Sequence, residues 1–190
     1  MTLSAVLLAG GESRRMGRDK ATIVFQGQSL WQRQIELLRG LRPTRVFVSA
    51  RKEPSWLPIG TELLLDEPPS RGPLSGLTKA LEQMQTTHLA ALAVDMPLMT
   101  SDQMQVLWSL ATTGCGVLPM IGARAEPLAA IYPAEVAADF AAALFGSDYS
   151  VQTLTKNLAR AGKVQTWEVP HEARDFFRSL NEPSDLALDA

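Results

Sequence analysis

The sequence is poor in the residues from which several classes of protein are built. It has one cysteine, Cys115, so an internal disulfide is excluded and we expect a reducing compartment, the cytoplasm. Nothing near Cys115 in the sequence supplies a base, so we expect a small buried residue and not a nucleophile. The two histidines, His88 and His171, form no catalytic pattern and are expected to be structural or solvated.

Charge of one sign and long apolar runs are also missing. A net charge of -2 over 18 basic and 20 acidic residues gives neither a basic nucleic-acid surface nor an acidic tail, so we expect no nucleic-acid partner. No segment reaches the ~20 apolar residues of a membrane helix, so we expect no membrane partner. The apolar start at 1–9 lacks a positive flank and meets Gly10, which favours a buried strand over a signal peptide.

What the chain does have is enough apolar sequence for one compact domain, arranged in alternating patterns. Of its 190 residues, 46% are hydrophobic, and we expect a single domain over 1–190. Short apolar runs predict strands at 4–8, 45–50, 62–65, 88–94, 116–120, 128–132 and 163–169. Helical patterns lie between them at 29–38, 73–85, 101–111, 133–144 and 151–161, with Ser101 as the predicted cap of the third.

This alternation predicts an α/β fold with a mainly parallel sheet covered by helices on both faces. Ligands of such sheets bind beyond the carboxyl ends of the strands. The first strand is followed by Gly10-Gly11, where the backbone can turn sharply and approach an anion closely. Four cations then fall within seven positions, a concentration that suits a triphosphate: Arg14, Arg15, Arg18 and Lys20.

The two common phosphate motifs, G-x-x-x-x-G-K-[ST] and G-x-G-x-x-G, are absent. On glycine and charge alone, the segment also fits a turn followed by a solvated basic loop. The longer string L-A-G-G-x-S-x-R-M-G-x-D-K-A over 8–21 is more specific, and it resembles the signature of the molybdenum cofactor guanylyltransferases and their relatives. The resemblance implies a Rossmann-like three-layer nucleotidyltransferase fold.

The resemblance continues over most of the chain. G-Q-S-L at 27–30 is similar to a family segment that leads into the first helix, and R-G-P-L-S-G at 71–76 to one that contacts nucleotide. Weaker matches are E-P-L at 126–128 and the segment at 180–186, where Ser179 and Glu182 depart from the family's asparagine and threonine. Ser49 also departs, because guanylyl members often have asparagine there.

Guanylyl members of this family join GMP from GTP to molybdopterin and use Mg²⁺. The resemblance therefore implies GTP and molybdopterin as substrates, and proteins that deliver or accept the cofactor as partners. It places the nucleotide against the residues Leu8, Ala9, Gly10, Gly11, Lys20, Ser49, Asp66 and Asp95. Lys20 and Arg15 would stabilise charge, and Asp95 would hold Mg²⁺.

Plainer interpretations stay open at both aspartates. Asp66 follows a predicted strand, as a ligand carboxylate should, but it also fits a turn or a helix cap. Asp95, followed by Met96-Pro97, resembles the family's D-x-P metal site and fits a strand-ending turn as well. Three alternatives to GMP transfer onto molybdopterin remain: a cytidylyltransferase acting on the same pterin, a guanylyltransferase with another phosphorylated acceptor, and a nucleotide sensor without activity.

Overall fold

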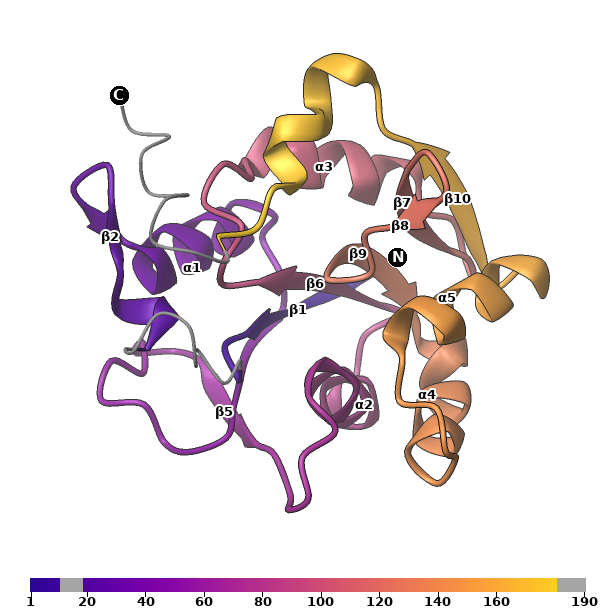
Figure 1. Ribbon diagram of the computed structural model, residues 1–190, viewed down its shortest axis with the longest axis horizontal. Helices are drawn as coiled ribbons and strands as arrows, with labels where there is room; N and C mark the ends of the chain where they lie inside the picture. Colours follow the sequence, from indigo (N-terminus) through magenta and orange to yellow (C-terminus); the bar gives the residue numbers. More distant parts are fainter. Residues whose placement is uncertain (11–18, 181–190) are drawn as a thin grey trace.

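A mixed, mainly parallel sheet forms the centre of the molecule in a computed structural model, which describes residues 1–10 and 19–180 (Figure 1). The strand order is β10-β7-β9-β6-β1-β4-β5, with β8 paired to β7. These strands are β1 (Leu3–Leu8), β4 (Arg45–Ala50), β5 (Glu62–Leu65), β6 (His88–Ala93), β7 (Gly116–Ile121), β8 (Arg124–Ala125), β9 (Ala129–Pro133) and β10 (Val164–Glu168). A separate hairpin joins β2 (Val24–Phe25) to β3 (Gln28–Ser29).

Helices cover both faces of this sheet (Figure 1). α1 (Leu30–Gly40) and α3 (Ser101–Leu110) pack on one face, together with the 3₁₀ segment η3 (His171–Phe177). α2 (Pro73–Gln83), α4 (Ala137–Leu144) and α5 (Val151–Arg160) pack on the other. Two further 3₁₀ turns are η1 (Lys20–Thr22) and η2 (Ala134–Val136).

The largely apolar sequence of β1, in which Ser4 is the one polar residue, is explained by the two cores that it separates. Side chains of a strand alternate between faces, so Ala5 and Leu7 enter the core beneath α1 and α3. Val6 and Leu8 enter the core beneath α2, α4 and α5. All six residues of β1 are buried, as expected for a central strand of a sheet covered on both sides.

Local sequence sets where the helices begin. The Ser29 and Gln32 side chains form a capping box at α1, and Pro73 occupies the first turn of α2, where it costs no hydrogen bond. The prediction of Ser101 as the cap of α3 was wrong by one residue. Thr100 is the cap, because its side chain accepts a hydrogen bond from the Gln103 amide at 3.2 Å.

The mainly parallel α/β architecture is confirmed, and the departures from prediction are local. β9 runs antiparallel to both β6 and β7. The short strands β2, β3 and β8 were not predicted, because two residues carry no periodic signal. Cys115 is only partly buried, whereas burial was predicted. Within the ranges described, no helix is both long and apolar enough to cross a bilayer.

Gly116 lets β7 lie tightly against β9, and this contact gives a test of the fold. A Cβ at position 116 would fall inside contact distance of the Ile131 carbonyl oxygen and 2.8 Å from the Pro133 side chain. We therefore expect Gly116→Ala to lower the free energy of unfolding by about 1–3 kcal/mol, a typical cost of overpacking. Urea denaturation measures this loss.

Gly146→Ala is the matched control for that substitution. The nearest atom to a Cβ at Gly146 is the Ala143 carbonyl oxygen at 3.4 Å, which is ordinary contact. We expect this variant to keep wild-type stability. Equal stability of the two variants would show that β7 and β9 can separate at no cost.

Candidate active site

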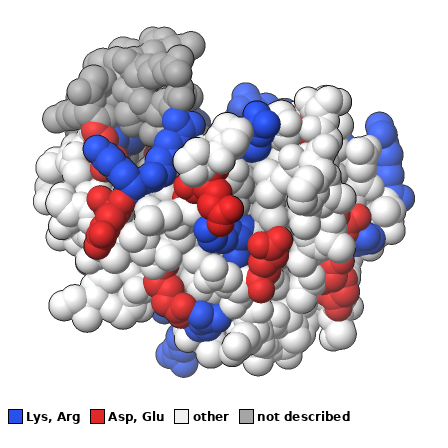
Figure 2. All heavy atoms as spheres, turned by 90° about the horizontal axis from the view of Figure 1, so that it is seen from below, with Lys and Arg blue, Asp and Glu red and all other residues white. Residues whose placement is uncertain are grey.

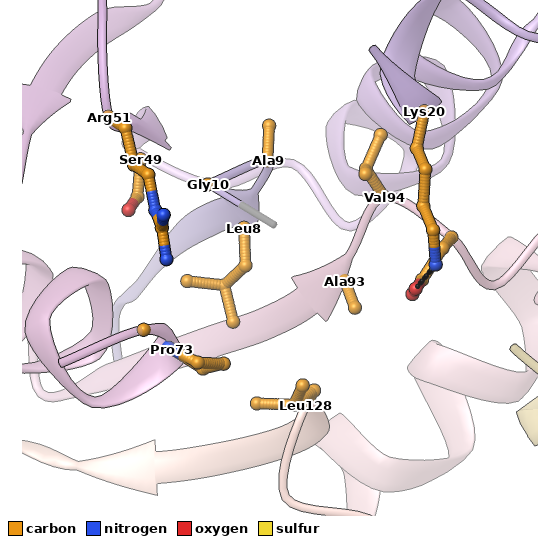
Figure 3. Close-up of a pocket in the computed structure, with 12 residues that line it drawn as sticks. Leu8, Ala9, Gly10, Lys20, Ser49, Arg51, Pro73, Ala93, Val94 and Leu128 are labelled. Carbon is orange, nitrogen blue, oxygen red and sulfur yellow. Dashed lines mark hydrogen bonds and ion pairs between the residues drawn. The ribbon is translucent and has the colours of Figure 1, made fainter. Parts of the chain in front are cut away.

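The carboxyl ends of β1, β4 and β6 meet at one edge of the sheet, and a pocket of about 380 Å³ opens there (Figure 3). A volume in this range suits a small-molecule ligand. β9 runs the opposite way, so its start reaches the same edge, and the Leu128 carbonyl accepts a hydrogen bond from Ala93 at 2.8 Å. The pocket is lined by Leu8, Ala9, Gly10, Lys20, Ser49, Arg51, Gly72, Pro73, Ala93, Val94, Asp95 and Leu128.

Lys20 and Asp95 form an ion pair at one end of the pocket, drawn as a dashed line in Figure 3. The Lys20 ammonium lies 2.9 Å from Asp95 Oδ2, and the two side chains are only 16% and 22% exposed. Lys20 also donates to the Leu180 carbonyl at 2.6 Å, and the Leu180 amide donates to the Asp95 carbonyl at 2.7 Å. Leu180 is thus bonded to both residues of the pair.

Lys20 is the first residue of the turn η1, and contacts of the preceding Asp19 hold this turn in place. Asp19 caps it by accepting from the Ala21 amide at 3.0 Å, and Asp19 Oδ2 accepts from the Trp56 indole at 3.0 Å. Trp56 in turn stacks on Trp31 of α1, with ring centroids 5.5 Å apart. The start of η1 is therefore tied to Trp56 through Asp19, and the Lys20 side chain reaches from η1 to Asp95, just after the end of β6.

The N-terminus of α2 faces the same pocket through Gly72 and Pro73. Amides at a helix N-terminus carry partial positive charge and attract anions. Gly72 has a φ of 64°, which favours glycine at the turn into the helix. Gly76 lets the helix approach closely, because a Cβ there would collide with Ser49 and lie 3.1 Å from the Leu8 side chain.

Asp66 lies beside the pocket and is held by two serines. Ser70 Oγ donates to Asp66 Oδ2 at 2.6 Å, and Ser49 Oγ donates to Oδ1 at 3.4 Å. A Cβ added to Gly10 would lie 3.5 Å from Asp66 Oδ2, so the carboxylate is close to the backbone after β1. The Asp66 carboxylate is therefore held next to Gly10 and Ser49, two residues that line the pocket.

A buried tyrosine supports the part of the pocket wall that contains Leu128. The Tyr132 hydroxyl donates to the Pro127 carbonyl at 2.6 Å and thereby fixes the residue before Leu128. Burial raises the pKa of Tyr132, so this hydroxyl stays a donor. Burial also raises the pKa of Glu126, and the nearby Arg124 opposes that rise. The segment that carries Leu128 is thus held to β9 by Tyr132 and to β6 by the hydrogen bond from Ala93.

The structure brings together most of the residues that the sequence nominated. Leu8, Ala9, Gly10, Lys20, Ser49 and Asp95 line the pocket, and Asp66 adjoins it. Gly11 and Arg15 lie outside the described residues. Sequence reasoning missed Arg51, which lines the pocket. The signal was present, because Arg51 follows the carboxyl end of β4, the position that singled out Asp66 and Asp95 in their own strands.

Positive charge in the described pocket comes from two sides. Lys20 and Arg51 stand on opposite walls, with the Arg51 guanidinium directed toward the space beside Leu8 and Pro73 (Figure 3). Elsewhere, basic and acidic side chains are intermixed on the face seen in Figure 2. The described pocket therefore has two cations, Lys20 and Arg51, and one anion, Asp95, in a chain whose net charge is -2.

The donor set fits Mg²⁺ bound together with a phosphorylated ligand. Over 1–10 and 19–180, no three His, Cys, Asp or Glu residues gather into a ready-made metal cage. Mg²⁺ does not need one, because it keeps several waters and takes one or two carboxylates beside substrate phosphates. Asp95 supplies such a carboxylate at the pocket, next to the cation that a phosphate would also contact.

Comparisons with known proteins place this geometry in a family. Residues 5–162 match the MobA-like NTP transferase domain. The probable molybdenum cofactor guanylyltransferase of Opitutus terrae is 35% identical over 96% of this chain and 92% of its own. The molybdenum cofactor guanylyltransferase of Cereibacter sphaeroides is 35% identical over 98% and 95%.

A solved structure agrees on the fold. Molybdopterin-guanine dinucleotide biosynthesis protein A from Archaeoglobus fulgidus superposes with a TM-score of 0.75 at 22% identity, covering 99% of this chain and 96% of that one. The match to the domain covers well over half of the chain, and it contains every described pocket residue. The chain is a member of the MobA-like NTP transferase family.

Proposed function

We propose that this chain transfers GMP from GTP to molybdopterin, releases pyrophosphate and forms the guanine dinucleotide cofactor. Two relatives named for this activity match it over nearly their full lengths. The observation that carries the proposal is the Lys20–Asp95 pair, set at the end of a pocket that α2 and the Gly10 turn also line. A phosphate-binding cation and a metal-binding carboxylate thus face one point.

The reaction asks for positioning and charge stabilisation. An oxygen of the molybdopterin phosphate forms a bond to the α-phosphorus of GTP, and the bond from that phosphorus to the oxygen bridging to the β-phosphate breaks. The bonding electrons leave with pyrophosphate. Because the attacking phosphate is already anionic at neutral pH, no dedicated base is required, which agrees with a pocket lined by no histidine or cysteine among the described residues.

Each nominated residue has a role in this scheme. Lys20 would stabilise negative charge growing on the α-phosphate and the leaving pyrophosphate, and Arg15 is proposed to share that role. Mg²⁺ held by Asp95 would supply Lewis-acid charge to the phosphate oxygens. Leu8, Ala9, Gly10 and Gly11 would approach the nucleotide through their backbone, while the amides at the start of α2 attract phosphate.

Asp66 supports guanine as the base. A carboxylate accepts hydrogen bonds, and guanine presents adjacent ring and exocyclic N–H donors. Ser49 and Ser70 hold the Asp66 carboxylate beside Gly10, and glycine leaves room for a purine to approach. Ser49 itself can donate or accept one hydrogen bond where relatives often carry an amide.

We also propose that 1–190 acts as one nucleotidyltransferase domain in the cytoplasm, with proteins that deliver or receive the cofactor as its partners. Both apolar cores pack against one continuous sheet, which supports a single domain. The single cysteine supports a reducing compartment. Such partners can be sought by purifying the intact protein from cells that also express the other proteins of the cofactor pathway.

We expect Lys20→Ala to reduce pyrophosphate release about a hundredfold, because losing one charge-stabilising contact costs ~3 kcal/mol of barrier. Lys163→Ala is the matched control, since Lys163 forms a similar ion pair with Asp139 at 2.7 Å outside the pocket. The control should keep its activity. A folded Lys20→Ala variant with near-normal turnover would remove Lys20 from the mechanism.

Asp95→Asn is expected to abolish Mg²⁺-dependent activity while leaving the fold intact, because it keeps size and removes charge. Pyrophosphate release measured across a Mg²⁺ titration tests this, with Asp139→Asn as the control for loss of a lysine-paired carboxylate. An Asp95→Asn protein with an unchanged Mg²⁺ profile would make Asp95 a strand-ending residue and contradict the metal assignment.

Wild-type protein should prefer GTP over CTP in kcat/KM with molybdopterin as acceptor, and Asp66→Asn should reduce that preference at least tenfold. The reason is that a site built to pair buried polar groups rejects a ligand that leaves them unpaired. Rates with both nucleotides at several concentrations give the ratio. A clear preference for CTP would move the chain to the cytidylyl alternative while keeping its fold.

A further inference from the structure

The loop that carries Asp95 is fixed by an unusual set of backbone contacts. Three consecutive carbonyls accept hydrogen bonds from three different donors. The Asp95 carbonyl accepts from the Leu180 amide at 2.7 Å. The Met96 carbonyl accepts from Gln34 Nε2 at 2.5 Å, and the Pro97 carbonyl accepts from Arg33 Nε at 2.6 Å. Two of these donors are neighbouring side chains of α1.

Gln34 is placed at some cost to the protein. Its side chain is fully buried, and among the residues that the structure describes its Oε1 has no hydrogen-bond partner. Only the amide nitrogen can donate to the Met96 carbonyl, so the oxygen is forced to the opposite side. A buried acceptor without a partner is destabilising, and its presence calls for a reason other than stability.

The Met96 carbonyl does not depend on Gln34 for satisfaction. It also accepts from the Met99 amide at 3.2 Å, within the turn that follows Asp95. If position 34 were apolar, the Met96 carbonyl would therefore still have a hydrogen-bond partner. The unpaired side-chain oxygen on α1 would be gone. What Gln34 adds is a direct tie between a rigid helix and the residue after Asp95.

We propose that Gln34 and Arg33 are positioning residues, which hold the 95–97 backbone so that the Asp95 carboxylate meets the metal in the correct orientation. This inference rests on the proposed role of Asp95 as the Mg²⁺ ligand. Replacing a group that orients a metal ligand commonly weakens metal affinity by about 10–100-fold. α1 thus serves the site although it lines no part of the pocket among the described residues.

Gln34→Met tests the inference, because methionine keeps the length of the side chain and removes both the donor and the orphan oxygen. Gln152→Met is the matched control. Gln152 Nε2 on α5 also donates to a backbone carbonyl, that of Ala125, at 2.5 Å, away from the Asp95 loop. The two variants lose the same kind of bond, so any difference between them reports on its location.

The first measurement needs neither metal nor substrate. Hydrogen exchange of the peptide covering 94–99 should be faster in Gln34→Met than in wild type, by about tenfold or more, and unchanged in Gln152→Met. The second measurement is Mn²⁺ affinity, followed by electron paramagnetic resonance, with α,β-methylene GTP bound. We expect about tenfold weaker Mn²⁺ binding in Gln34→Met and wild-type affinity in the control.

Unchanged exchange at 94–99, equal effects in the two variants, or faster exchange with unchanged Mn²⁺ affinity would each overturn the inference. If Gln34→Met does not fold, Arg33→Lys decides by the same measurements, because it keeps the charge and loses the Nε donor to Pro97. Wild-type protein that binds no Mn²⁺ with the analogue would contradict the proposed function itself. If wild type binds Mn²⁺ with the analogue and the variant binds it with the same affinity, only the positioning role is contradicted.

Discussion

Parallel pairing of β1 with both β4 and β6 is the constraint on which the rest of the molecule depends. Leu8 pairs with Ser49 on one side and with Ala93 on the other, so three segments distant in sequence end at one level. Parallel strands direct their carboxyl ends to the same edge, and each delivers the residues that follow it. Gly10, Arg51 and Asp95 therefore surround one space, although they come from three segments that are distant in the sequence.

Charge is handled by the same arrangement. Lys20 and Asp95 are in contact at the pocket, and both side chains are mostly removed from water. Removing two charges from water costs free energy unless additional hydrogen bonds compensate. The Leu180 carbonyl provides a further acceptor for Lys20. Such a pair contributes little net stability, because the desolvation of both groups offsets the attraction between their charges.

Small residues set the closeness of the walls. Gly76 brings α2 against Ser49 and Leu8, and Gly10 brings the backbone after β1 close to Asp66. Each glycine therefore allows two parts of the proposed nucleotide site to approach each other closely. Both glycines lie within the part of the chain that matches the family's domain.

The sequence by itself determined the element types, the layered architecture and most of the pocket. β4 and β5 begin and end at the predicted residues, because each contains a short apolar run with polar or turn-forming residues on both sides. Lys20, Asp95 and the Gly10 turn were identified because their motif is contiguous or directly follows a strand. These are features that neighbouring residues encode.

Only the tertiary structure decided the features that join distant residues. The contact from Lys20 to Leu180 spans 160 positions, and that from Gln34 to Met96 spans 62. The antiparallel direction of β9, which brings Leu128 to the pocket, depends on which strands lie beside it and not on its own sequence. Helical periodicity marks Gln34 as a residue on a buried face, but the carbonyl that it bonds is supplied by packing. Partners of this kind exist only once the chain has folded, because nothing in either local sequence specifies the other.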